Sequence, residues 1–324
     1  MRAGVGIVAI MVALSLGASA CTVVKPGSAV PVAHYTRYDP ADANAAFGDL
    51  TTIDPCSLVD VATLPKDLHA TVSAPRSMDY CELKLDVAGD TAVADIGELV
   101  SSTGEHLTDA EQVAGGITMY PDTLSYGSCD SYLSFTGTPM YLTSDVSAET
   151  GDGSEALCTA SQEIARNAAS AIADQRVTHV ATVPANSLRR VNPCGLVGPG
   201  VLLPAGLGAP VTYPARHQCV WNAAGNDLSE YAQLLFLVGP RPEPEDGSTA
   251  TQIGGRDSVV QVTDDGDFGD CQIDTGGIAS GAAQQDLVEI AEVFVYASGQ
   301  TGAAACQLGT AIASAAWPKL PASG

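Results

Sequence analysis

Positive charge is scarce in this chain. It carries 14 Lys and Arg residues against 37 Asp and Glu residues, which gives a formal net charge of −23 over 324 residues. Such a surface repels phosphate backbones, and no run of Lys or Arg offsets it, so we expect no nucleic-acid partner. The excess of carboxylates favours solubility and also fits an acidic face for a basic partner.

The sequence motifs of common catalytic and metal sites are also missing. There is no Gly-x-Ser-x-Gly and no His-Glu-x-x-His, and the five His residues are scattered. The closest two cysteines are 25 positions apart, whereas structural zinc sites use Cys-x2-4-Cys pairs. The carboxylate-rich stretch 264–270 lacks the ligand order of a calcium loop and is interpreted as an acidic turn. We therefore predict no catalytic residue, no metal site and no cofactor, and expect a protein that is not an enzyme.

The N-terminus has the pattern of a secretory signal. Arg2 precedes an uncharged apolar stretch, residues 5–16, that is too short to span a bilayer comfortably. Small residues follow in Ala18-Ser19-Ala20-Cys21, as at a bacterial lipoprotein processing site, although Ala18 stands where Leu is more usual. We predict a signal peptide over 1–20 and lipidation of Cys21, which would anchor the chain on the extracytoplasmic face of the cell membrane. The alternative is ordinary cleavage near Ala20 with Cys21 left as a free thiol.

A four-cysteine pattern occurs twice. The stretch 53–59 (IDPCSLV) returns as 191–197 (VNPCGLV), and the next cysteine follows 25 positions after the first in both copies. Assigning Cys21 to the lipid leaves eight cysteines, and an exported chain meets an oxidising compartment in which they pair. The two sets are Cys56, Cys81, Cys129 and Cys158, then Cys194, Cys219, Cys271 and Cys306. The sequence thus predicts one module written twice.

Spacing alone allows three pairings within each set. The equal interval favours a local bond between the first two cysteines, Cys56–Cys81 and Cys194–Cys219, and leaves Cys129–Cys158 and Cys271–Cys306. The rival scheme joins the first cysteine to the fourth and the second to the third. Each bond would stabilise the fold by roughly 3–4 kcal/mol, mostly by restricting the unfolded chain.

The predicted organisation is a flexible tether (21–46), module one (47–176), a linker (177–190) and module two (191–324). Asp54-Pro55 and Asn192-Pro193 each provide an N-cap followed by Pro at the first helical position. The first helix is expected over 55–62, and Gly198-Pro199 is expected to end the second one early. Strands are expected from Cys81 and Cys219, and over 131–142, 231–238 and 287–297, with Gly239-Pro240 stopping the fourth.

Two further features recur in both copies. Gly-Gly pairs at 115–116 and 254–255 predict tight turns. Apolar residues spaced 7, 4 and 4 predict a closing helix over 156–172 and another from Ala305 onward, which Pro318 ends or kinks. Each closing helix has a cysteine near its start, followed by Ile-Ala after five residues.

These motifs together resemble a known family. Asp-Pro-Cys-Ser-Leu at 54–58, Cys-x-Trp at 219–221, the Gly-rich middle and the Cys-x5-Ile-Ala helices are similar to an actinobacterial lipoprotein family catalogued as domain of unknown function 3558. The resemblance covers both modules and implies a tandem version, in which module one departs from the pattern at Leu83, where Trp is expected. It implies an α+β fold of two similar disulfide-stapled domains, each an antiparallel sheet with flanking helices akin to the Mog1/PsbP-like fold. It brings no catalytic residues.

The function expected from these observations is that of a lipid-anchored extracytoplasmic binding or interaction protein. Its partner would be an envelope protein or a small ligand, in addition to the membrane reached through the anchor. The alternative is a carrier of a lipid or another apolar envelope ligand, which would need an apolar cavity of several hundred Å³. A hydrolase is the third hypothesis.

Overall fold

The computed structural model describes residues 47–73, 76–100, 107–125, 127–135, 140–149, 153–223, 227–279 and 287–322. The predicted signal peptide, Cys21 and the tether lie outside the described residues. Within them the chain forms mostly antiparallel sheet, with few helices and four disulfides. No helix in these ranges combines the length and the apolar character needed to cross a membrane.

The first half of the chain builds a seven-stranded sheet in the order β1-β3-β4-β8-β7-β6-β5. Every neighbouring pair in it is antiparallel. Its strands are β1 (Thr71–Val72), β3 (Cys81–Val87), β4 (Asp90–Val100), β5 (Glu111–Ala114), β6 (Ile117–Pro121), β7 (Ser128–Ser134) and β8 (Tyr141–Ala148).

The second half builds another antiparallel sheet in the order β9-β10-β11-β15-β14-β13-β12, which is the same path as in the first sheet. The short strand β2 (Arg76–Ser77) comes from the first half but pairs with β11 of this sheet. The remaining strands are β9 (Val211–Thr212), β10 (Gln218–Ala223), β11 (Asp227–Pro240), β12 (Ser248–Ile253), β13 (Arg256–Asp264), β14 (Phe268–Ala279) and β15 (Leu287–Ser298).

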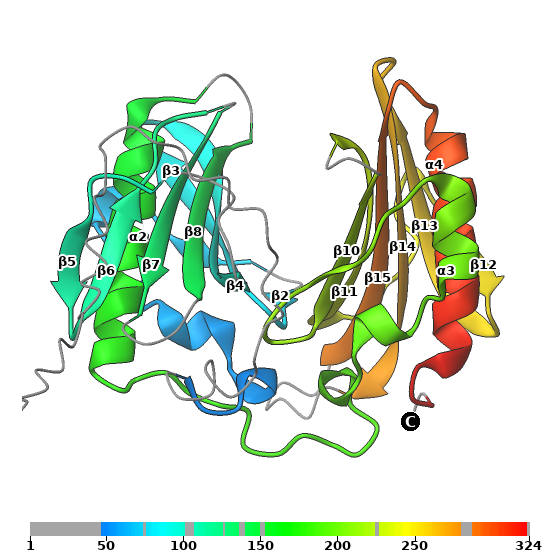
Figure 1. Ribbon diagram of the computed structural model, residues 1–324, viewed down its shortest axis with the longest axis horizontal. Helices are drawn as coiled ribbons and strands as arrows, with labels where there is room; N and C mark the ends of the chain where they lie inside the picture. The colour runs from blue at the N-terminus through cyan, green and yellow to red at the C-terminus, as the bar shows by residue number, and fades with distance from the viewer. Residues whose placement is uncertain are drawn as a thin grey trace, which may run out of the picture. The chain divides into compact units, whose positions relative to one another are not determined.

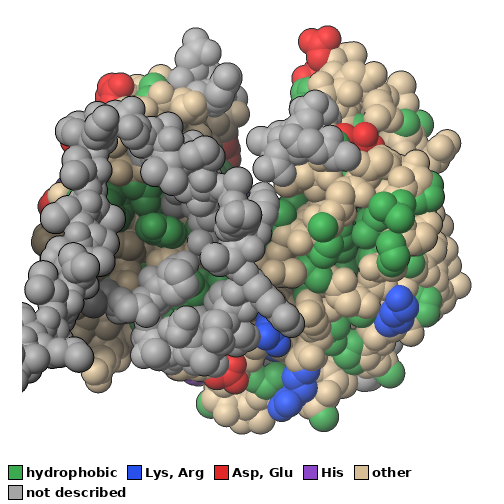
Figure 2. All heavy atoms as spheres, in the orientation of Figure 1, with side chains coloured by type: hydrophobic (Ala, Val, Ile, Leu, Met, Phe, Trp, Pro, Cys, Tyr) green, Lys and Arg blue, Asp and Glu red, His purple; other side chains and the backbone are tan. Residues whose placement is uncertain are grey.

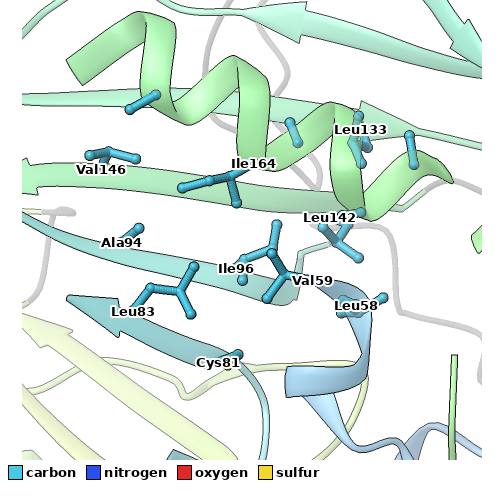
Figure 3. Close-up of a cluster of buried hydrophobic side chains, with 14 of the residues drawn as sticks. Leu58, Val59, Cys81, Leu83, Ala94, Ile96, Leu133, Leu142, Val146 and Ile164 are labelled. Atoms are coloured by element: carbon cyan, nitrogen blue, oxygen red, sulfur yellow. The ribbon is translucent and has the colours of Figure 1, made fainter. Parts of the chain in front are cut away.

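One long helix covers one face of each sheet (Figure 1). Helix α2 (Glu155–Ala173) packs Leu157, Ile164 and Ala168 on the first sheet, as the predicted spacing requires. Figure 3 shows Ile164 and Leu133 in this core, between the helix and the side chains of Leu83, Ala94 and Ile96 on β3 and β4. Since apolar side chains occupy one face of every central strand, the opposite face is left for polar residues.

Helix α4 (Gly302–Ala316) covers the second sheet and buries Ile312, Ala313 and Ala316. Trp221 and Trp317 are both 0% exposed in this second core. The indole Nε1 of Trp317 donates to Ser258 Oγ at 3.1 Å, which satisfies its buried donor. Pro318 lies in a 3-10 turn, Trp317–Lys319, that follows the helix, so it ends the helix rather than kinking it.

Two disulfides in each half connect the sheet to the segments that cover it. The bonds are Cys56–Cys81, Cys129–Cys158, Cys194–Cys219 and Cys271–Cys306. These are the pairs favoured by the equal spacing, and none joins the first and fourth cysteines of a set. In each half, one bond ties the N-terminal turn to a strand and the other ties a strand to the long helix.

The turns that begin each half differ from the expectation. Asp54 Oδ1 accepts from Cys56 N at 3.2 Å and Asn192 Oδ1 from Cys194 N at 3.1 Å, so both predicted caps are present. The helices are only single 3-10 turns, Pro55–Leu58 and Pro193–Gly195. The helix over 55–62 was therefore predicted too long. Pro199 begins a short helix, α3 (Pro199–Leu202), instead of ending one, because its ring suits the first helical position.

Two strand predictions were also wrong in extent. The stretch 131–142 is not one strand, because β7 ends at Ser134 and β8 begins at Tyr141. Strand β11 does not stop before Gly239-Pro240 but continues to Pro240 opposite Leu287. The Gly-Gly turns are present as predicted, with positive φ at all four glycines. The stretch 264–270 contains the predicted acidic turn between β13 and β14.

Candidate functional site

The two halves are joined by shared backbone hydrogen bonds. Arg76 and Ser77 of β2 pair with Val238 and Leu237 of β11, and the next amide, Met78 N, donates to Phe236 O at 3.0 Å. Met78 is 1% exposed and belongs to the core of the second half. The first half therefore completes the second sheet beside β11.

A buried hydrogen bond between a histidine and a carboxyl follows directly after β2. His217 Nδ1 lies 2.8 Å from Asp79 Oδ1 and 3.3 Å from Met78 O. Both neighbouring atoms accept, so Nδ1 carries a hydrogen. His217 is 0% exposed, and its Nε2 has no hydrogen-bond partner among the described residues, and neither has Asp79 Oδ2.

Tyr80 comes next and extends this junction with an apolar contact. Its ring packs on a cluster formed by Leu235, Leu237 and Ile290 of the second half. Burial raises the pKa of Tyr80 well above its ordinary value, and the charges of Asp95 and Glu292 add to that effect. The phenol is therefore neutral, and carboxylates from both halves lie close enough to act on it.

The main polar feature of the first sheet is a line of four carboxylates, called here the carboxylate row: Glu82, Asp95, Asp145 and Asp130. They lie on adjacent strands β3, β4, β8 and β7. The register sets Glu82 opposite Asp95, Asp95 opposite Asp145, and Asp145 opposite Asp130. Along each strand these half-buried carboxyls alternate with buried core residues, so they occupy the face of the sheet opposite α2. Like charges directly opposite one another destabilise a sheet, so the row calls for a functional explanation.

The second sheet carries no such row at the equivalent positions. Cys219 pairs with Leu234 as Cys81 pairs with Ile96, which fixes the correspondence between the sheets. The residues that match the row in register are Val220, Gln233, Phe294 and Gln272. All four are uncharged. The acidic row is therefore a property of the first half and not a requirement of the shared strand order.

The electrostatics of the row favour bound protons. Burial raises the pKa of Asp95 to about 7, and the Glu82 carboxylate contributes. Burial likewise raises the pKa of Asp145 to about 7, with a further contribution from its hydrogen bond to Asp130, while the bond from Ser147 acts the other way. Tyr132 Oη donates to Asp130 Oδ2 at 2.9 Å. At neutral pH the row therefore holds protons that ordinary carboxyls have lost.

A fifth carboxyl, Glu98, joins the row through a β-bulge. The register of β4 against β8 shifts between Ile96 and Leu99, and Gly97 within it has φ +113°. A Cβ at Gly97 would come within 2.8 Å of Leu58 Cδ1, so only glycine fits this bulge without displacing the core. The extra residue turns Glu98 to the same face as Asp95. Burial raises the pKa of Glu98 to about 8, and the charges of Asp79 and Asp95 add to it.

Several acceptor oxygens around Glu98 lack a donor. Gln218 is 5% exposed and donates to Glu98, yet its own Oε1 has no partner in the described part of the chain. Asp79, also 5% exposed, leaves Oδ2 unpaired, and Asp95 leaves Oδ1 unpaired. Buried polar atoms normally have a partner. What is missing here is a hydrogen-bond donor or a positive charge.

The second sheet also carries two neighbouring acidic residues, at positions that do not match the row. Asp274 and Glu292 face each other in register, and Gln272 Nε2 donates to both, at 3.0 and 3.1 Å. Burial raises the pKa of Asp274 to about 6 and that of Glu292 to about 8, the latter also because of the Asp274 charge. Asp274 also lines a 600 Å³ pocket beside Arg241 and Arg256.

Arginines gather elsewhere, in a 470 Å³ pocket lined by Arg189, Arg190, Arg216, Asp49 and Thr52. Two of these arginines already have structural partners. Arg189 Nη1 donates to the carbonyls of Thr51 and Ile53, and Arg190 donates to those of Val183 and Pro184. These bonds fasten the segment predicted as a linker, so this pocket is weaker evidence for a ligand than the carboxylate row.

The predicted linker is in fact packed in place near its end. Glu289, 2% exposed, accepts from Ser187 Oγ at 2.6 Å and from Leu188 N at 2.5 Å. Leu188 is 2% exposed within the second core. Residues 187–190, at the end of the predicted linker over 177–190, therefore belong to the folded structure.

Of the predicted site residues, Cys21 lies outside the described residues and the other eight cysteines form the four disulfides. Within the described ranges, no group of three or more His, Cys, Asp or Glu side chains is arranged to hold a metal ion. The carboxylate row was missed by the sequence analysis. Its only signal was acidic residues at alternate strand positions, and the register that aligns them is not readable from one sequence.

Comparison with protein-family models, curated proteins and solved structures finds no match to this chain. The description of the site therefore depends on its own geometry. Lys and Arg side chains are few on the face shown in Figure 2. Among the described residues no Lys or Arg forms an ion pair with a carboxyl of the row.

Proposed function

We propose that this protein is a lipid-anchored, extracytoplasmic binding protein of the cell envelope that catalyses no reaction. In this proposal its two halves are tandem copies of one module, related to the family named above and to the Mog1/PsbP-like fold, and Cys21 carries the lipid. The ligand-recognition surface is the carboxylate row together with Glu98. The four disulfides support the oxidising, extracytoplasmic setting.

The observation that carries the proposal is the contrast between the equivalent rows of the two sheets. Four carboxyls stand in the first sheet where the second has Val220, Gln233, Phe294 and Gln272. Folding alone accommodates uncharged residues at these positions. A surface that keeps opposed carboxyls, although their ionised forms repel one another, is best explained by a partner whose positive charge replaces the retained protons.

The alternative, a carrier of an apolar ligand, has less support. Among the pockets lined by described residues, the one with mainly apolar walls, formed by residues including Phe47, Leu50 and Leu142, has a volume of only 10 Å³. A carrier needs several hundred Å³ of apolar space. The larger pockets at 470 and 600 Å³ are lined by charged and polar side chains.

Native mass spectrometry of the full chain, purified from its own envelope, tests the proposal. We expect a bound species that is released on denaturation and is lost from an Asp95→Asn/Asp145→Asn double variant. The control is Asp67→Asn, which removes one exposed charge outside the row. A bound species retained equally by all three proteins would refute the row as the recognition surface.

A further inference from the structure

The carboxylate row has a defined length and direction. Neighbouring strands lie about 4.8 Å apart, so four carboxyls on adjacent strands form a line of roughly 14 Å. The line runs across the strands from Glu82 on β3 to Asp130 on β7. A ligand that meets all four must present positive charges at regular intervals along one axis.

The unpaired acceptor atoms around Glu98 favour a cation that donates hydrogen bonds. Three side chains that act on Glu98, Gln218, Asp79 and Asp95, each have an unpaired oxygen, and all three oxygens accept. Two of these side chains, Gln218 and Asp79, are 5% exposed, so water reaches them poorly. An ammonium group carries several N–H donors and one positive charge, and therefore satisfies unpaired acceptors and carboxylates together. A single metal ion would need three or more ligands around one point, whereas the described carboxyls are spread along a line.

The surroundings favour a small ligand over a protein partner. Stable protein interfaces have an apolar or aromatic centre. In the described part of the chain the exposed large apolar side chains are Val72, Leu203 and Val262, which belong to three different elements. None of them lies on the strands β4, β7 or β8. The row is half-buried and one residue wide on each strand, which suits a thin flexible chain.

We propose that the carboxylate row and Glu98 bind a linear polyamine, in which ammonium groups separated by three or four methylene groups meet carboxylates on successive strands. The inference rests on the proposed function and specifies its ligand. Glu98 lies along β4 from Asp95 and so stands beside the line of the row, and the ammonium nearest to it donates to Gln218 Oε1 and Asp79 Oδ2. The methylene segments lie between the strand positions.

Binding of the polyamine releases protons. The row's own strands contribute Tyr132, Ser147 and the exposed Lys84 to its surroundings. Other elements contribute Tyr80, Asp79, Gln218 and Glu292. Most of these are acidic or neutral, so the row is protonated in part near pH 7. A cation favours the charged carboxylates and displaces those protons.

The test is isothermal titration calorimetry of the full chain with spermidine at pH 7.5, in two buffers of different ionisation enthalpy. We expect one bound spermidine per chain, with a heat that differs between the buffers because protons are released. The Asp95→Asn/Asp145→Asn double variant is expected to bind at least about tenfold more weakly, since two charge-assisted contacts are lost. Asp67→Asn is expected to bind as the wild type does. Near pH 5 the wild type is expected to bind more weakly.

Spermidine binding that is absent, or unchanged in the double variant, overturns the polyamine assignment. Binding of Mg²⁺, Ca²⁺ or tetralysine in place of spermidine also overturns it. If spermidine does not bind but the double variant loses a different co-purified species in native mass spectrometry, the polyamine inference fails and the proposed function stands. If the double variant keeps both its spermidine affinity and the co-purified species, the polyamine inference and the proposed function both fail. Far-ultraviolet circular dichroism of the variants verifies that they are folded.

Discussion

At the scale of single residues, the carboxyls of the first sheet link stability to pH. An Asp in an unfolded chain titrates near its ordinary pKa of about 4. In the fold the pKa is about 7 for Asp95 and Asp145 and about 8 for Glu98, mainly because of burial. Between these values the folded state holds more protons than the unfolded state. Its free energy of unfolding therefore falls as the pH rises from about 4 to about 8.

We expect urea unfolding, with the disulfides intact, to show a loss of about 2–4 kcal/mol between pH 5 and pH 8. The estimate is kept below the full sum of the shifts because these carboxyls are partly exposed. Asp145→Asn mimics the protonated form and is expected to flatten the slope, whereas Asp67→Asn leaves it unchanged. Stability that increases over this range would show that the row is ionised in the fold.

The two His–Asp contacts of the described residues provide a matched comparison. His217 and Asp79 are buried at 2.8 Å, whereas His69 and Asp86 are exposed at 3.6 Å. Breaking a buried pair leaves an uncompensated polar group, but an exposed pair contributes little. We expect His217→Asn to lower the free energy of unfolding by about 3–5 kcal/mol and His69→Asn to change it by less than about 0.5 kcal/mol. Equal effects of the two substitutions in chemical denaturation would contradict a stabilising role for the buried His217–Asp79 contact.

At the scale of elements, the approach of α4 to the hairpin between β13 and β14 depends on two glycines. A Cβ at Gly269 would lie 2.1 Å from Gly302 N, and one at Gly302 would lie 2.4 Å from Thr263 O. Backbone atoms at such distances cannot move aside as a flexible side chain can. The start of the closing helix is therefore seated directly on the hairpin backbone, next to the Cys271–Cys306 bond.

Gly269→Ala is expected to destabilise the protein by roughly 2–4 kcal/mol, as overpacking between backbones does. Gly195→Ala is the control, because a Cβ there meets no atom within 4 Å and its φ is not positive. Thermal unfolding followed by circular dichroism compares the two. A Gly269 variant as stable as the control would mean that the helix docks differently.

Sequence reasoning succeeded where a local pattern determines an element. Repeated cysteine intervals indicated the disulfide pairs, and apolar spacing indicated α2 and α4. It failed where tertiary pairing overrides the local signal. Pro240 stays in β11, where Leu287 opposes it. The separation of β7 from β8 did have a local signal, because Gly137 and Pro139 are of residue types that favour turns, and the predicted single strand overlooked them. The carboxylate row depends on the register of four strands, which a single sequence does not encode visibly.

At the scale of the whole molecule, side chains of each half enter the core of the other. Met78 belongs to the second core, and Ala215 of the second half belongs to the first. Tyr80, β2 and Arg189 add further contacts between the halves. Because of these contacts, unfolding of one half would remove core contacts from the other half and destabilise it.

We expect differential scanning calorimetry of the wild type to show one transition. Tyr80→Ala removes the aromatic contact with Leu235, Leu237 and Ile290 and is expected to cost about 3–4 kcal/mol and to separate the transition into two. Leu203→Ala, at a side chain 68% exposed, serves as the control and is expected to leave a single peak. Two peaks in the wild type itself would show that the halves unfold independently.

The pairing of β2 with β11 also makes the halves unequal. A fragment that begins after residue 176 would lack Arg76 and Ser77 and would leave Leu237 and Val238 as an open strand edge. Open edges pair with whatever strand is at hand, including the same edge of another copy. Such a fragment would tend to self-associate or to exchange strands. The second half therefore depends on the two residues of β2 that the first half supplies. A cut between the halves would not yield two equivalent proteins.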